Sequence, residues 1–161
     1  MPKSPDTPHL DSYDRKMLAL LQADGSLGPA ELSTRVNLSA SQCSRRLQRL
    51  REQGLIAHTV AILDRDALNL GISAFLLIRL GSHAPQNEQK FVSAVEVMPE
   101  VVSCHYTTGD LDFILNVVTR DLASYDVLLR RILGAAEISS CRSNLVLRTA
   151  KSTTAVTLNF A

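Results

Sequence analysis

The 161-residue sequence predicts an α+β protein in two parts, with helices first and a mixture of strands and helices afterwards. Two observations predict this class. Up to residue 56, apolar residues recur at the three- and four-residue spacing of helices. From residue 57 onward, short apolar runs are separated by Gly, Pro and Asp, which is typical of strands alternating with helices. Residues 1–9 contain three prolines and no apolar run, so we predict a disordered lead-in there.

Residues 10–56 carry the signals of three helices, and the first two have clear start residues. Asp11 is a suitable N-cap, because its carboxylate can accept a hydrogen bond from a free backbone N–H of the first turn, and Gly25 closes that helix. Pro29 suits the first turn of the second helix, since its missing N–H would have no partner there. The apolar faces of the two helices comprise Met17, Leu18, Leu21, Leu32 and Val36.

A tight turn joins the second helix to the third. Asn37 tolerates the left-handed conformation that ends a helix, and the Leu that follows can pack back onto the helix just completed. Ser39 then caps the third helix, with Gln42 completing a Ser-x-x-Gln capping box. Two helices joined by so short a turn form a helix-turn-helix.

The third helix has an apolar face and a cationic face. Cys43, Leu47 and Leu50 fall at i, i+4 and i+7, so they face inward. The net charge of the chain is only +1, yet five arginines and no acidic residue occur from Arg35 to Arg51. Arg can bridge guanine O6 and N7, Gln can pair with adenine, and further Arg and Ser groups can hold phosphates of double-stranded DNA. The predicted DNA-contacting residues are Arg35, Ser41, Gln42, Ser44, Arg45, Arg46 and Arg49.

Two alternatives exist for this cationic helix. The arginines can form a solvated surface face, or the helical part can belong to a protein-interaction adaptor that does not bind DNA. Like charges at i, i+4 repel, so a cationic face without an acid before Glu52 is costly to keep for solubility alone. Together with the tight turn and the capping box, this favours DNA binding.

Residues 57–71 are predicted as a linker strand and hinge, and residues 72–161 as a ferredoxin-like domain. Helices are expected at 86–98 and after an Asp121 N-cap. The predicted strands are Ile72–Leu80, Val101–Thr108, Leu111–Val118 and Leu145–Thr149, with Thr153–Leu158 as a candidate for one more. The order is therefore β-α-β-β-α-β, which gives one antiparallel sheet with both helices on one face.

The second face of that sheet is also predicted to be apolar. Along the first strand Phe75 and Leu77 point to one face, and the other face carries Ile72, Ala74, Leu76, Ile78 and Leu80. Along the third strand Ile114 and Val118 point to one face, and the other face carries Leu111, Phe113, Leu115 and Val117. Both faces are therefore apolar, although the helices of the fold cover only one. A monomer would expose this patch, which soluble proteins rarely tolerate. Pairing with an identical sheet would bury it, so the periodicity predicts a homodimer, the symmetry that palindromic DNA sites require.

Several classes of protein are disfavoured. The three cysteines are odd in number and far apart, which argues for a reducing compartment such as the cytoplasm, without disulfides or a zinc site. No apolar run approaches the roughly 20 residues of a membrane-spanning helix. No catalytic triad, paired-carboxylate spacing or phosphate-binding glycine loop is present, so we expect no enzymatic activity, cofactor or metal.

Four stretches together resemble one family over nearly the whole chain. They are LDSYDRKMLALLQADG (10–25), ELSTRVNLSASQCSRRLQRLREQGLI (31–56), AILD (61–64) and HYTTGDLDFIL (105–115). In this order and spacing the chain resembles the leucine-responsive and asparagine regulator (Lrp/AsnC) family of bacterial and archaeal transcription factors. The resemblance implies a winged helix-turn-helix followed by a RAM-type, ferredoxin-like domain that senses amino acids. It also implies dimers that assemble further into octamers and bend DNA.

The resemblance further implies an effector site at the turn between the middle strands. Its residues would be Tyr106, Thr107, Thr108, Gly109, Asp110 and Asp112. An amino acid needs N–H donors for its carboxylate and an acceptor for its ammonium, and a Gly-containing turn with an Asp can supply both. The alternative is that Gly109-Asp110 only makes a good hairpin turn.

The sequence also departs from the family pattern, and one enzyme class shares the architecture. His58-Thr59 stands where many members have Gly-Tyr, and Asn144 where an aromatic residue is common. The sirohaem decarboxylases have the same architecture. They need a pocket for a large macrocycle, whereas this chain has 4% aromatic residues and no Trp. We therefore expect a regulator.

Overall fold

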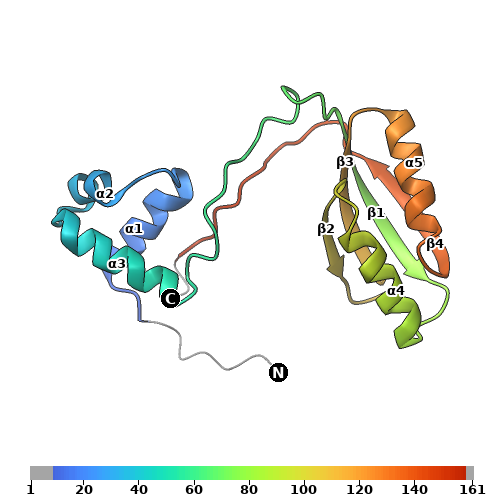
Figure 1. Ribbon diagram of the computed structural model, residues 1–161, viewed down its shortest axis with the longest axis horizontal. Helices are drawn as coiled ribbons and strands as arrows, with labels where there is room; N and C mark the ends of the chain where they lie inside the picture. Colours follow the sequence, from blue (N-terminus) through green and yellow to red (C-terminus); the bar gives the residue numbers. More distant parts are fainter. Residues whose placement is uncertain (1–8, 159–161) are drawn as a thin grey trace. The chain divides into compact units, whose positions relative to one another are not determined.

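The computed structural model of the chain describes residues 9–158 (Figure 1). These residues form two compact units, one of residues 9–62 with 151–158 and the other of residues 63–150. Apart from residue 9, the predicted lead-in lies outside the described residues. Within the described part of the chain, no helix is long and apolar enough to cross a membrane.

The first unit contains the three predicted helices, α1 (Ser12–Ala23), α2 (Pro29–Val36) and α3 (Ala40–Glu52). Asp11 caps α1, and Ser39 with Gln42 forms the predicted capping box of α3. Asn37 adopts the left-handed conformation, with φ of 57°, which confirms the tight turn of a helix-turn-helix. The helices enclose a small core of Met17, Leu27, Leu32, Val36, Cys43 and Leu47.

The last described residues pack onto these helices. The Gln22 side chain donates to the Val156 carbonyl at 3.1 Å and accepts from the Val156 N–H at 2.6 Å. Leu158 lies against a second small cluster of Leu10, Leu18 and Leu50. The candidate strand at 153–158 is wrong, because the Val156 backbone bonds to a side chain rather than to a neighbouring strand. Residues 57–71 contain turns and no strand either.

The second unit has the predicted β-α-β-β-α-β order. Its elements are β1 (Ile72–Leu80), α4 (Pro85–Glu96), β2 (Val101–Tyr106), β3 (Phe113–Thr119), α5 (Leu122–Leu133) and β4 (Ile138–Leu145). The strands lie in the order β2-β3-β1-β4, and every neighbouring pair is antiparallel. Both helices pack on the same face of the sheet, where Leu76, Phe91 and Leu128 belong to one core cluster (Figure 1).

The closing strand lies earlier in the sequence than predicted. β4 ends at Leu145, whereas the sequence analysis placed a strand at 145–149. In the sheet formed by the described residues, β4 lies at the edge and pairs with β1. Its hydrophobic residues Ile138 and Cys141 pack against the core. Its other positions are mostly Ser, Arg and Asn, so the strand carries almost no apolar signal.

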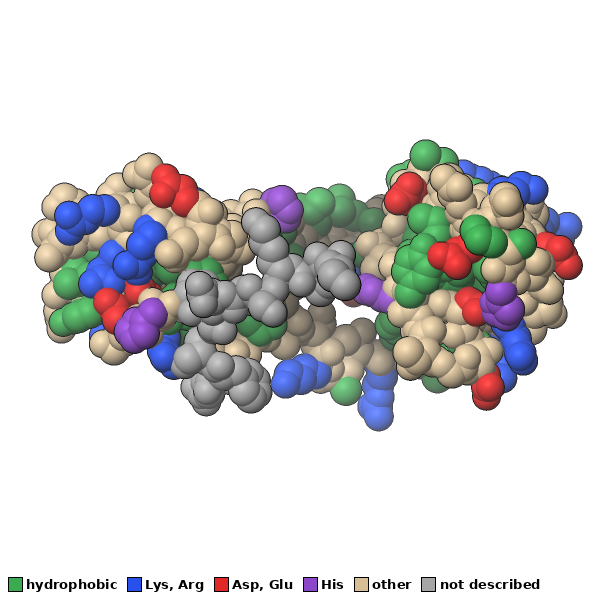
Figure 2. Space-filling model, turned by 90° about the horizontal axis from the view of Figure 1, so that it is seen from below, with side chains coloured by type: hydrophobic (Ala, Val, Ile, Leu, Met, Phe, Trp, Pro, Cys, Tyr) green, Lys and Arg blue, Asp and Glu red, His purple; other side chains and the backbone are tan. Residues whose placement is uncertain are grey.

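The face of the sheet without helices is partly apolar, as predicted. Ala74, Leu76 and Ile78 are fully buried under the helices, while Phe75, on the opposite face, is 43% exposed. Leu77 lies beside Ile114 of β3 on that same open face. We call the residues Phe75, Leu77 and Ile114 the open-face patch. Figure 2 shows hydrophobic side chains at the surface of this unit.

Candidate functional site

The first candidate site is the outer surface of α3. Cys43, Leu47 and Leu50 are buried on the inner face, as predicted. Arg45, by contrast, is exposed, and neither its side chain nor the exposed side chains of Ser44 and Arg35 form a hydrogen bond or ion pair with another described residue. Figure 2 shows basic side chains over the helical unit, with acidic ones among them. These three side chains are therefore available to a ligand.

Two other predicted DNA-contacting residues are occupied at the start of α3. The Gln42 carbonyl oxygen Oε1 accepts hydrogen bonds from the Ser39 N–H at 2.9 Å and the Ser39 hydroxyl at 3.0 Å. The Ser41 hydroxyl lies 3.0 Å from the Ser39 hydroxyl. Gln42 therefore keeps its Nε2 donors for another partner, while its acceptor serves the cap.

Arg46 and Arg49 are bound by two carboxylates of the first helix, Asp11 and Asp14, which we call the carboxylate pair. Arg46 donates to Asp11 at 2.7 Å and to Asp14 at 2.8 Å. Arg49 donates to the second Asp14 oxygen at 2.5 Å. Only 1% of the Asp14 side chain is exposed, compared with 25% of the Arg46 side chain and 44% of the Arg49 side chain. Both arginines therefore serve contacts within the protein.

The ionisation of this cluster follows from the contacts. Partial burial raises the pKa of the Asp11 carboxyl, but the Asp14 backbone N–H and the Arg46 guanidinium stabilise its anion, so the net direction is downward. The hydrogen bond to Asp11 raises the pKa of Arg46, and Asp14 adds to this. Arg46 also lies 5.5 Å from the centre of the Tyr13 ring. The lowered pKa of Asp11 and the raised pKa of Arg46 both favour the charged forms of this ion pair.

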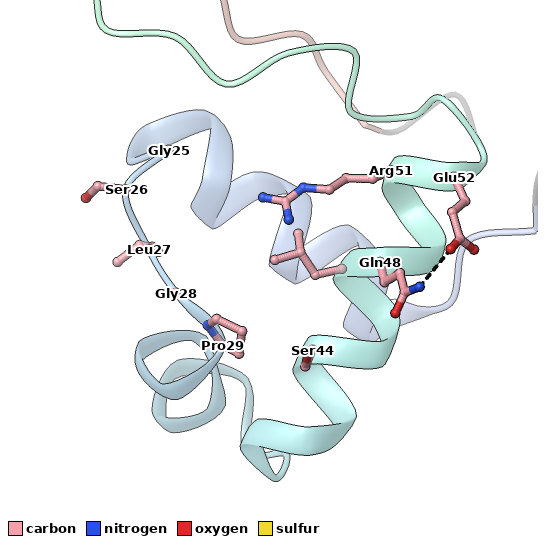
Figure 3. Close-up of a pocket in the computed structure, with 10 residues that line it drawn as sticks. Gly25, Ser26, Leu27, Gly28, Pro29, Ser44, Gln48, Arg51 and Glu52 are labelled. Carbon is pink, nitrogen blue, oxygen red and sulfur yellow. Dashed lines mark hydrogen bonds between the residues drawn. The ribbon is translucent and has the colours of Figure 1, made fainter.

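A groove of about 510 Å³ borders one flank of α3 (Figure 3). Its opposite wall is the turn between α1 and α2, at residues 25–29. Ser44, Gln48 and Arg51 line the α3 side, at i, i+4 and i+7. Gln48 donates to Glu52 at 2.8 Å. Gln48 is not among the residues predicted to contact DNA, although it lies directly after the buried Leu47 on α3.

The second candidate site is the turn between β2 and β3. The strands end earlier and begin later than predicted, which leaves a six-residue turn at 107–112. The Thr107 N–H donates to the Asp112 carbonyl at 3.0 Å, and the Thr107 hydroxyl to the Leu111 carbonyl at 2.8 Å. Gly109 has φ of +97°, a conformation that favours glycine. Tyr106 is 63% exposed and its ring lies 4.7 Å from that of Phe113.

Asp112 anchors this turn to the end of β1. Its Oδ2 atom accepts from the Leu80 N–H at 2.7 Å, and its own N–H donates to the Ile78 carbonyl at 2.9 Å. His83 lies 3.4 Å from the other carboxylate oxygen. Asp112 thus has a structural role that the sequence analysis did not foresee.

The remaining groups of the turn are open to a ligand. Thr108, Gly109 and Asp110 are exposed, and their N–H groups have no hydrogen-bond acceptor among residues 9–158. The Asp110 carboxylate has no partner among these residues either. An exposed acid beside free N–H donors can hold a small molecule that carries both charges. No group of His, Cys, Asp and Glu suited to a metal ion occurs in the described part of the chain.

Two family models match the chain, one for each unit. Residues 10–57 match a model described as winged helix-turn-helix DNA-binding, and residues 73–156 match one described as the Lrp/AsnC ligand binding domain. The first match contains the carboxylate pair and α3. The second contains the turn at 107–112.

Characterised relatives match along nearly their whole length. The chain is 38% identical to the HTH-type transcriptional regulator Zrp of Zymomonas mobilis, over 94% of this chain and 99% of Zrp. It is 35% identical to the DNA-binding transcriptional activator DecR of Escherichia coli, over 91% of this chain and 97% of DecR. A transcriptional regulator of Neisseria meningitidis, solved with L-Met, superposes with a TM-score of 0.90 at 35% identity, over 94% of this chain and 99% of that one.

Proposed function

Because this chain belongs to the Lrp/AsnC family of transcriptional regulators, we propose that it reads specific DNA sequences as a homodimer and that an amino acid controls this binding. The relatives are named as transcriptional regulators with helix-turn-helix domains, so the chain is a regulator and not an enzyme. We propose that it acts in the cytoplasm, where the DNA of the organisms of its relatives lies.

The observation that carries the DNA-binding proposal is the division of α3 into two faces. Cys43, Leu47 and Leu50 form a buried face, the apolar seam, and the opposite face is a free cationic surface. Arg45 and Ser44 are exposed on this surface, and we propose that both contact base edges. Arg35 is proposed to neutralise phosphate. The partly engaged residues Ser41, Gln42, Arg46 and Arg49 are proposed to add contacts with the donors that remain free.

The turn at 107–112 is the proposed effector site. The free N–H groups of Thr108, Gly109 and Asp110 suit the carboxylate of an amino acid, and the Asp110 side chain suits its ammonium. Tyr106 and Thr107 would border the side chain of the effector, while Asp112 holds the turn in place. The L-Met complex of the Neisseria meningitidis relative supports a ligand of this class.

Self-association is proposed through the open-face patch. Burial of Phe75, Leu77 and Ile114 against a second copy removes apolar surface from water and creates a two-fold axis. Two copies of α3 can then read two half-sites of one DNA element. Further assembly of dimers, up to an octamer, would let an amino acid at the turn influence how the DNA is bent.

Binding to random-sequence duplex DNA tests the proposed function directly. The purified protein is expected to enrich a subset of duplexes, and its affinity for them should fall steeply as salt rises, because each neutralised phosphate releases counterions. In a thermal-shift screen of the amino acids, the effector should raise the melting temperature of the protein, because it binds the folded form. If the purified protein binds no duplex at low ionic strength, the proposal that it reads DNA is wrong.

Replacing Asp110 with alanine is expected to abolish the thermal shift caused by the effector and to leave the melting temperature of the free protein unchanged. Asp110 is exposed and has no partner among the described residues, so only the ligand loses a contact. Asp112→Ala should lower the melting temperature of the free protein, because it leaves the Leu80 N–H without its acceptor. The cost in folding free energy is about 1–3 kcal/mol. An undiminished shift in Asp110→Ala would place the effector elsewhere.

A further inference from the structure

The carboxylate pair meets α3 on one flank. Arg46 and Arg49 are spaced i, i+3 on α3, and they match the i, i+3 spacing of Asp11 and Asp14 at the start of α1. Asp14 is 1% exposed, and an arginine occupies each of its two oxygens. A buried carboxylate persists only when its oxygens are paired, so this contact is an obligatory part of the folded unit.

The apolar seam alone does not fix how α3 is rotated. Contacts of Cys43, Leu47 and Leu50 are non-directional, so they decide which side faces inward but allow small rotations and shifts. Ion pairs with two charged hydrogen bonds are directional and short. The carboxylate pair therefore fixes the rotation of α3, which the apolar seam alone does not. A base edge is read only by a side chain that arrives at the correct angle.

We propose that Asp14 is a positioning residue for sequence recognition: by holding Arg46 and Arg49 it fixes the rotation of α3 and so aims Arg45 at the bases. This inference rests on the proposed DNA-reading function. It assigns Arg46 and Arg49 mainly to this task, and it leaves sequence discrimination to the exposed side of the helix.

A purely electrostatic role for the carboxylate pair predicts the opposite outcome. If the acids merely lower the positive charge of the unit, Asp14→Asn should strengthen binding to every duplex alike. If Asp14 positions α3, the same variant should lose affinity for the preferred duplex while binding to unrelated DNA stays equal or rises. The ratio of the two affinities therefore separates the two roles.

The experiment compares Asp14→Asn with the native protein and with Glu52→Gln. Glu52 is an exposed acid on α3 outside the cluster, so the control removes the same charge without disturbing Arg46 or Arg49. The probes are a duplex enriched from a random pool by the native protein and a scrambled duplex of equal composition. Binding is measured well below the melting temperature of each variant. The affinity ratio should fall about tenfold or more in Asp14→Asn, as for one lost base contact, and should not change in Glu52→Gln.

Asp11→Asn keeps the test decisive if Asp14→Asn does not fold. Asn caps helices as well as Asp does, so this variant should retain α1 while its neutral side chain no longer balances the Arg46 charge. Its affinity ratio should also fall, by less than in Asp14→Asn. A ratio equal to that of Glu52→Gln in the folded variants would overturn the positioning role. Failure of the native protein to enrich any sequence would instead overturn the proposed function.

Discussion

Replacing Arg45 with alanine is expected to lower the affinity for the preferred duplex about ten- to a hundredfold and to leave the melting temperature unchanged. One bidentate contact between Arg and guanine discriminates by about 1–3 kcal/mol, a factor of about 5 to 150, and the expected loss lies within these limits. Arg45 is exposed and forms no hydrogen bond or ion pair with another described residue, so its removal should cost the fold little. Fluorescence anisotropy with the enriched duplex measures the affinity, and calorimetry measures the melting temperature.

Two further substitutions separate recognition from charge and from folding. Arg130→Ala removes an equal charge from α5. Among residues 9–158 Arg130 pairs only with the exposed Asp126, so DNA affinity should change little. Arg46→Ala should lower the melting temperature, because it leaves the buried Asp14 with one arginine fewer. If Arg45→Ala binds the enriched duplex as tightly as Arg130→Ala does, Arg45 does not contact the bases.

Local signals explain why the helical unit could be predicted from sequence. The caps at Asp11 and Ser39 and the left-handed Asn37 depend on residues within three positions of one another. The buried seam of α3 follows from its periodicity. Such features depend on short stretches of sequence, and the structure confirms each of them.

The contacts of the candidate sites depend on tertiary structure and could not be predicted in the same way. Asp14 and Arg49 lie 35 positions apart, and nothing in either helix alone indicates that they meet. Asp112 similarly bonds to Leu80, 32 positions away. Asp112 had a sequence-based interpretation as a ligand group, whereas Asp14 had none. In both cases a distant partner gives the side chain a structural role.

Strand β4 illustrates a different limit. A strand in the middle of a sheet is recognised by its apolar residues, and β1 was predicted correctly for that reason. An edge strand needs few apolar contacts, since its hydrogen bonds to one neighbour position it. Ile138–Leu145 therefore has the composition of a loop. The closing strand was predicted at Leu145–Thr149 instead, because the apolar residues there resemble a strand.

Replacing Phe75 with glutamate is expected to convert the proposed dimer into a folded monomer and to weaken DNA binding by about two orders of magnitude or more. Phe75 lies on central strand β1 and is 43% exposed, so a monomer can carry a charge there. In the proposed dimer the same charge would be buried without a partner, which opposes association. Separate monomers also lose the effective concentration that links two half-sites, an effect of about 10²–10⁴ in affinity.

Leu122→Glu provides the matched control for this prediction. Leu122 is also exposed, at 59%, and lies in the first turn of α5, where an acidic residue favours the helix. It should remain dimeric on a sizing column and bind DNA like the native protein. If Phe75→Glu elutes with Leu122→Glu as a dimer, the open-face patch is not the interface. If it is monomeric but binds the enriched duplex undiminished, one copy of α3 suffices for recognition, and the two-fold arrangement has no role in reading the DNA.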